Sequence, residues 1–250
     1  MSKCNFSPWA FFNCQFIMLA LIMFMFLFSP RLCLAYSEID LKDGKALFDP
    51  PKIRVKGNVV YFDGKIKENS YTEILRKIGE NKIKKISINS VGGDAKSALQ
   101  IGFYVYHNDI DIDVRSVCAS ACANYIFPAG KQKHLGNDSY LLWHGGVNGP
   151  EKELNVSGGI SRDDFLKLPE IKEIRKEDVV FYKKIGVAIQ LSFCPQLKDD
   201  YNEKFPEKWF SYTPEDMGKF GMRNISYANS ASQWVKSMRK KHVIFASYCN

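Results

Sequence analysis

The segment from Val59 to Asn89 changes its hydrophobic period twice, and this change constrains the fold more than any other feature of the chain. Val59–Phe62 and Ile83–Asn89 are β-branched segments typical of strands, and Ile53–Gly57 has the same character. Between them, Ser70–Glu80 carries apolar residues at helical spacing behind a serine. A strand, a helix and a strand in this order predict two parallel strands joined by a right-handed crossover, and therefore an α/β fold.

The same alternation continues as far as residue 144. We expect a helix capped by Asp94 and reaching Tyr106, a strand at 112–117, a helix at 120–127 that ends before Pro128, and strands at 131–135 and 140–144. The strands of such a sheet deliver their loops to one edge, where functional residues gather. Beyond it, residues 145–159 are rich in glycine and residues 171–185 predict an exposed amphipathic helix.

Length and charge exclude some classes of protein. The chain has 250 residues, which suits one domain with a sizeable core, and its formal net charge is +8. The dense basic cluster Lys236–His242 is expected to be a solvated helix face, with contact to an anionic membrane surface as the alternative. Because no basic segment is interleaved with aromatic residues, no nucleic-acid partner is expected.

The N-terminus carries an unbroken apolar run of 13 residues, Phe16–Phe28. As a helix this run covers roughly 20 Å, short of the roughly 30 Å of a bilayer core. Together with the small residues that end at Ala35, it predicts a signal peptide over residues 1–35, export to the periplasm or out of the cell, and one domain over residues 36–250. An uncleaved membrane anchor over residues 9–28 is the alternative.

Four cysteines follow this leader, namely Cys118, Cys122, Cys194 and Cys249. An even number in an exported protein predicts disulfides, with three pairings open, and free buried thiols are the alternative. A bridge from either Cys118 or Cys122 to Cys194 would tie the turn around Ser120 to a later segment. No Cys or His pair has the spacing of zinc ligands, so neither a metal nor a cofactor is expected.

Three features at the ends of the predicted strands carry chemistry when they are taken together. Ser120 stands at a strand-to-helix turn as the candidate nucleophile, and His144, 24 residues later, is the candidate base. The backbone N–H groups of Gly92 and Ala121 are the candidate donors of an oxyanion hole. Singly, such residues are typical of a helix cap, a structural hydrogen bond and a turn; in combination they predict acyl transfer.

The order and spacing of three motifs resemble the Clp-type serine peptidases. The motifs are Asn89-Ser-Val-Gly-Gly93, Ala119-Ser-Ala121 and Tyr140-Leu-Leu-Trp-His144, and Phe210–Glu215 with Gly221-Met222 resembles the closing turn of that family. The resemblance covers about residues 55–144. It implies a single-domain Clp/crotonase-like fold of repeated strand-strand-helix units, with Ser120 as nucleophile and His144 as base. It also makes the helix at 171–185 a candidate contact in a homo-oligomer.

The acid that would orient His144 is not placed by the resemblance. In the family an Asp lies some ten residues before the Pro-Glu turn, and in this chain that position, counted from Pro214, is Lys204. The acids close to it are Asp199, Asp200, Glu203 and Glu207. We take Asp200 as the third catalytic residue, and a Ser–His dyad stays open.

The sequence therefore predicts an exported serine hydrolase, most simply a peptidase that cleaves short or unfolded peptides through an acyl-enzyme on Ser120. Its partners would be a peptide or protein substrate, and the N-terminus would supply any membrane association. One alternative is a non-catalytic peptide-binding or scaffolding protein of the same fold, which adds a peptide to a sheet edge. Another is a Ser/Lys hydrolase resembling the signal-peptide peptidases, in which a lysine replaces His144 as the base.

Overall fold

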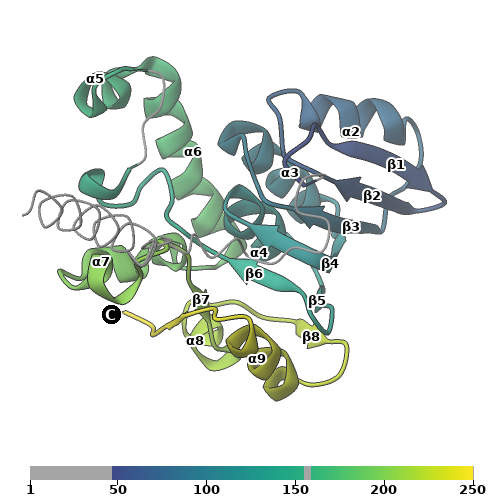
Figure 1. Ribbon diagram of the computed structural model, residues 1–250. Helices are drawn as coiled ribbons and strands as arrows, with labels where there is room; N and C mark the ends of the chain where they lie inside the picture. Colours follow the sequence, from purple (N-terminus) through teal and green to yellow (C-terminus); the bar gives the residue numbers. More distant parts are fainter. Residues whose placement is uncertain (1–46, 155–158, 250) are drawn as a thin grey trace, which may run out of the picture. The chain divides into compact units, whose positions relative to one another are not determined.

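The structure is a computed structural model that describes residues 47–154 and 159–249 (Figure 1). The expected signal peptide over residues 1–35 and the alternative anchor over residues 9–28 lie outside the described residues. No helix within the described ranges is long and apolar enough to cross a bilayer.

The described residues form an α/β structure around a seven-stranded sheet, as the alternating pattern predicts. Its strand order is β1-β2-β3-β4-β5-β8, with β6 paired to β4. The strands are β1 (Lys52–Lys56), β2 (Val59–Asp63), β3 (Lys85–Ser90), β4 (Asp111–Ala119), β5 (Lys133–Leu135), β6 (Tyr140–Leu142) and β8 (Ile225–Tyr227). The β1–β2 hairpin is antiparallel and the other pairs are parallel, so the sheet is mixed.

The strands next to one another in the sheet differ in how many of their faces are buried. In β2 only every second residue is buried, whereas in β3 every residue after Lys85 is buried. Ile86 of β3 lies between Val60 of β2 and Ile112 of β4, and all three side chains belong to the core. Central parallel strands are covered on both faces in such folds, which explains why β3 has no exposed side.

Helices and short turns surround this sheet (Figure 1). They are α2 (Ser70–Ile78), α3 (Ala95–His107), the π-helix η1 (Cys122–Ile126), α4 (Phe127–Ala129), the 3-10 turn η2 (Glu151–Glu153), α5 (Arg162–Lys167), α6 (Pro169–Ile185), the 3-10 turns η3 (Ile189–Ser192) and η4 (Cys194–Leu197), α7 (Tyr201–Lys204), α8 (Pro214–Lys219) and α9 (Ala231–Lys240). A small parallel pair, β7 (Ser211–Tyr212) and β9 (Phe245–Ala246), completes the described elements. Asp94 caps α3 as expected, because its carboxylate accepts a hydrogen bond from the Ser97 N–H at 2.7 Å.

Two local expectations need correction. The helix after Ser120 does not stop before Pro128, because Pro128 falls in the first turn of α4, where its missing N–H is not needed. The strand expected at 140–144 ends at Leu142, and its next residue, Trp143, instead pairs with Phe210 in an isolated bridge.

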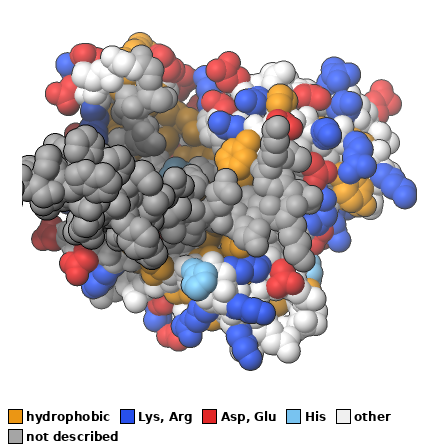
Figure 2. Space-filling view, in the orientation of Figure 1, with side chains coloured by type: hydrophobic (Ala, Val, Ile, Leu, Met, Phe, Trp, Pro, Cys, Tyr) orange, Lys and Arg blue, Asp and Glu red, His pale blue; other side chains and the backbone are white. Residues whose placement is uncertain are grey.

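Helix α6 is amphipathic, but part of its apolar character faces solvent. Phe181 and Tyr182 are buried, and so is the acidic residue Asp178. Val179 and Val180 are 52% and 58% exposed. On the face shown in Figure 2, basic and acidic side chains are interspersed, consistent with the modest net charge.

Candidate active site

Ser120 occupies a sharp turn between β4 and η1. Its φ is 55°, a left-handed conformation that costs a non-glycine residue about 1–2 kcal/mol. Hydrogen bonds hold the turn on both sides: the Ser120 N–H donates to the Leu142 carbonyl at 2.9 Å, and the Ser120 carbonyl accepts from the Asn124 N–H at 2.8 Å. The serine is therefore fixed at the edge of the sheet where β4 and β6 end.

A disulfide spans the same turn. Cys118, the penultimate residue of β4, is bonded to Cys122, the first residue of η1, and both are fully buried. The second disulfide joins Cys194 to Cys249, across 55 positions of sequence. The sequence also left open a bridge from Cys118 or Cys122 to Cys194, and the structure forms neither of these.

His144 and Ser120 are in hydrogen-bond contact, as their positions in the sequence predict. The His144 Nε2 lies 2.6 Å from the Ser120 Oγ. The histidine backbone is fixed from two sides, because the Gln196 side-chain amide donates to the His144 carbonyl at 3.0 Å and that of Asn124 donates to the Gly145 carbonyl at 2.9 Å. The indole of Trp209 packs against the imidazole, with ring centroids 4.4 Å apart.

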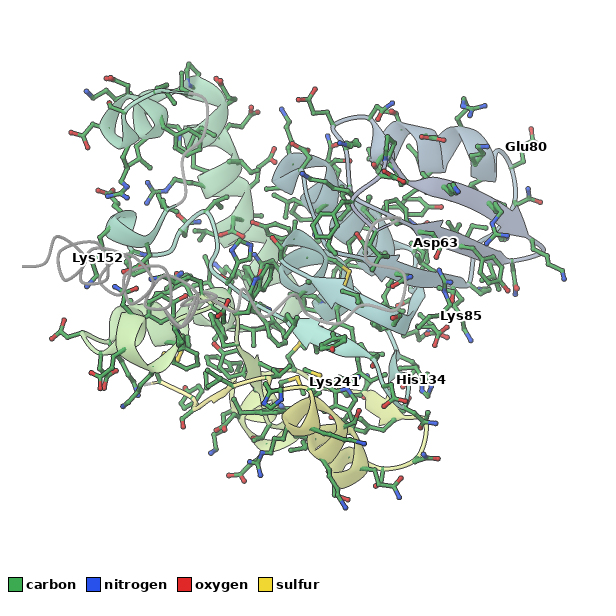
Figure 3. All side chains as sticks on the ribbon, in the orientation of Figure 1. Asp63, Glu80, Lys85, His134, Lys152 and Lys241 are labelled. Atoms are coloured by element: carbon green, nitrogen blue, oxygen red, sulfur yellow. A yellow bond between two sulfur atoms is a disulfide. The ribbon has the colours of Figure 1, made fainter. Side chains whose placement is uncertain are left out.

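Another histidine makes a similar contact elsewhere in the molecule. The His134 Nδ1 lies 3.1 Å from the Ser226 Oγ, where β5 pairs with β8. Figure 3 labels His134 at this end of the sheet. Neither residue lies against the glycine loop or a helix start, so this exposed pair serves as an internal control for the Ser120–His144 pair.

The acid expected behind His144 is not found at Asp200. The Asp200 carboxylate lies 2.6 Å from the Lys204 ammonium and is 43% exposed. The other acids considered, Asp199, Glu203 and Glu207, are exposed as well. In the part of the chain that the structure describes, Ser120 is the hydrogen-bond partner of the His144 ring and no carboxylate joins it.

Burial lowers the pKa of His144 to about 4, because the charged imidazolium loses its hydration. The ring is therefore neutral at pH 7 and is able to accept a proton from Ser120. Since no carboxylate stabilises the imidazolium, proton transfer to this ring is less favourable than in a Ser-His-Asp triad.

This pKa shift predicts a measurable effect on stability. Between pH 6.5 and pH 4, His144 is protonated in the unfolded chain but stays neutral in the folded chain. The free energy of unfolding therefore falls by up to about 3 kcal/mol as the pH is lowered through this range. Replacement His144→Gln abolishes this loss. In urea unfolding, the stability of the variant relative to wild type should therefore increase by that amount between pH 7 and pH 4. A constant difference would contradict the buried, unpaired histidine.

The comparison with a variant is needed because a second buried group opposes the first. Burial raises the pKa of Asp178 to about 6, and its hydrogen bond from Asn148 only partly offsets this effect. A carboxyl group with a raised pKa favours the folded chain as the pH falls from 6 toward 4. The free energy of unfolding of the wild type should thus depend less on pH than it would if His144 were the only group with a shifted pKa.

The same Asp178 anchors the loop that follows His144 to helix α6. The Asn148 amide donates to the Asp178 carboxylate at 2.7 Å and to the Arg175 carbonyl at 2.8 Å. In return, the Arg175 Nε donates to the Asn148 side-chain oxygen at 3.1 Å. The sequence pattern gave no signal for this network, because a buried acid within a Lys- and Glu-rich helix looks like a surface residue.

The glycine loop after β3 reaches the serine turn because Gly92 has no side chain. At its φ of 86°, a Cβ atom would lie 2.7 Å from the Ser120 Cβ and 2.8 Å from the Ala121 nitrogen. The Gly92 N–H, however, donates to the Ser90 Oγ at 3.1 Å, so the donor expected from the sequence is already engaged. Gly93 lines the pocket beside Ser120 instead, together with Ala121.

A pocket of about 240 Å³ opens beside Ser120 and His144. Its apolar lining residues are Ala95, Tyr125, Val147, Leu154, Phe165 and Ile171, and its polar ones include Asn124, Glu153 and Gln196. Sequence reasoning missed all of these, because they come from segments far apart in the sequence that only the folded chain brings together.

No protein-family model matches the chain, and no curated protein matches it either. The function is therefore inferred from the geometry of the site.

Proposed function

We propose that this protein is a serine hydrolase of Clp/crotonase-like fold, most simply a peptidase that acts through an acyl-enzyme. The observation that carries the proposal is the 2.6 Å contact between the Ser120 Oγ and the His144 Nε2 at a left-handed turn. Nucleophile and base within hydrogen-bond reach are the minimum machinery of acyl transfer.

The proposed reaction proceeds in two halves. In the first, the Ser120 Oγ attacks the substrate carbonyl carbon while the His144 Nε2 takes the hydroxyl proton. The tetrahedral oxyanion would accept hydrogen bonds from the Gly93 and Ala121 backbone N–H groups, which replaces the Gly92 and Ala121 pair expected from the sequence. The imidazolium then protonates the leaving amine. In the second half, water repeats these steps on the acyl-enzyme and regenerates Ser120.

The absence of an acid on His144 within the described residues points to a dyad. A dyad keeps the nucleophile, the base and the oxyanion donors, but it loses the stabilisation of the imidazolium. We therefore propose slow turnover on peptides. The competing proposal, a non-catalytic peptide-binding protein, draws on the same observation, because a site without its acid also fits a fold that has lost catalysis.

We further propose that the protein is exported. Two disulfides in one domain fit an oxidising compartment better than a reducing one, and the apolar run near the N-terminus agrees with this.

Labelling with a serine-directed peptidyl phosphonate tests the proposal. Such a probe forms a covalent adduct only with an activated serine, so wild type should be labelled and Ser120→Ala should not. Ser226→Ala, which removes the serine of the control pair, should be labelled like wild type. Wild type that stays unlabelled while it still binds peptides would support the non-catalytic protein.

A further inference from the structure

The pocket beside Ser120 combines apolar walls with one carboxylate. Glu153 is the acid among the described lining residues, and no lysine or arginine lines the pocket with it. The rest of the lining is mainly aliphatic and aromatic, with contributions from Leu154, Phe165 and Ile171. A substrate group that enters therefore meets apolar surface and a single negative charge.

The Glu153 carboxylate is partly buried and only loosely paired. Its side chain is 12% exposed, and its Oε2 lies 3.7 Å from the Lys208 Nζ. At this distance the two groups form an ion pair but no hydrogen bond. Lys208 is itself 46% exposed, does not line the pocket, and also places its ammonium 4.9 Å from the Tyr201 ring. The carboxylate thus keeps the capacity to accept hydrogen bonds from another cation.

The backbone around Glu153 is held in place, so the carboxylate is a fixed feature of the site. Glu153 ends the turn η2, where its N–H donates to the Pro150 carbonyl at 2.9 Å. Glu151, at the start of that turn, lies 3.8 Å from Arg175 of α6, which also holds Asn148. Figure 3 labels Lys152 in the same turn.

We infer that this pocket binds a substrate side chain with an aliphatic stem and a terminal ammonium, that is lysine or a close analogue, and that Glu153 selects it. The inference rests on the proposed function. The stem would pack on the apolar lining, while the ammonium would donate to Glu153 in place of the loosely held Lys208. A charge-assisted hydrogen bond in a partly enclosed pocket discriminates against a neutral side chain of the same shape.

Two phosphonate probes test this inference, one with a lysine side chain next to the phosphorus and one with norleucine, which has a similar stem without the charge. The rate of Ser120 labelling is measured with each. In wild type, the lysine probe should react at least about tenfold faster. In Glu153→Gln this preference should disappear, while the norleucine rate stays within about twofold of wild type.

Two further variants guard against indirect effects. Lys208→Met removes the competing cation, so the preference for the lysine probe should rise above that of wild type. Glu170→Gln removes an exposed acid of α6 that does not line the pocket, and the preference should stay unchanged.

The outcomes separate the inference from the proposed function. If Ser120 is labelled but Glu153→Gln keeps the wild-type ratio of the two rates, or lowers both rates equally, the lysine pocket is wrong and the hydrolase stands. If neither probe labels Ser120, the hydrolase fails, and the lysine pocket fails with it.

Discussion

Ser120→Ala, His144→Ala and the double variant are expected to lose the same amount of activity, roughly 10³-fold or more in kcat/KM. The two side chains act as one unit, because the 2.6 Å contact delivers the serine proton to the imidazole. Once either side chain is missing, the proton transfer from Ser120 to His144 cannot take place. Hydrolysis of an activated peptide ester by the four proteins measures the effect.

The pair His134 and Ser226 provides the matched control for this experiment. These residues also form a Ser–His hydrogen bond, at 3.1 Å, but they lie on β5 and β8, away from the glycine loop. Their double replacement by alanine should leave kcat/KM within about twofold of wild type. If the losses at Ser120 and His144 add instead, the two residues act independently and the proposed proton transfer is wrong.

The strands and most helices were predictable because their signals are local. β2 carries a run of four apolar residues, Val59–Phe62, whereas in β3 Ile86 and Ile88 alternate with polar residues, and both patterns are typical of strands. The contact of Ser120 with His144 was predictable for a related reason. Both residues follow strands that pair in parallel, β4 and β6, so their loops meet at one edge.

The surroundings of His144 were not predictable, because they depend on contacts between distant segments. Trp209 reaches the imidazole only because Trp143 pairs with Phe210 through an isolated bridge, which leaves no periodic pattern in the sequence. The choice of Asp200 failed for this reason. Distance along the chain from Pro214 does not determine which side chain faces the ring, and Asp200 instead pairs with Lys204 at the surface.

The donor in the glycine loop shows a different limit. Sequence reasoning identified the need for glycine but not which of the two N–H groups is available. That depends on Ser90, whose hydroxyl accepts the Gly92 N–H within the same short loop. A two-residue interaction of this kind is decided by backbone conformation, and Gly92 and Gly93 differ in it, with φ values of 86° and 139°.

The Cys194–Cys249 disulfide is expected to contribute more to stability, and the Cys118–Cys122 disulfide more to catalysis. Replacing Cys194 and Cys249 with alanine should lower the free energy of unfolding by about 4 kcal/mol, because this bridge closes a long loop in the unfolded chain. Replacing Cys118 and Cys122 should cost only about 2 kcal/mol through the same effect, since four positions separate them. Urea unfolding of both double variants measures the difference.

The rate of Ser120 labelling by the phosphonate should fall more in the Cys118/Cys122 variant than in the Cys194/Cys249 variant, the reverse of the order in stability. The Cys118–Cys122 bridge spans the turn that holds Ser120 in its left-handed conformation, and relaxation of that conformation releases about 1–2 kcal/mol. Without the bridge the labelling rate should fall about tenfold, because each 1.4 kcal/mol changes a rate by that factor.

The Cys194–Cys249 variant is the control for this second measurement. Cys194 begins η4, which also contains Gln196, the residue that binds the His144 carbonyl. The Gln196 N–H is separately bonded to the Phe193 carbonyl at 2.9 Å, so its position does not depend on the disulfide alone. The labelling rate of this variant should stay within about threefold of wild type while it remains folded. Equal losses of labelling in both variants would mean that the short bridge has no particular role at Ser120.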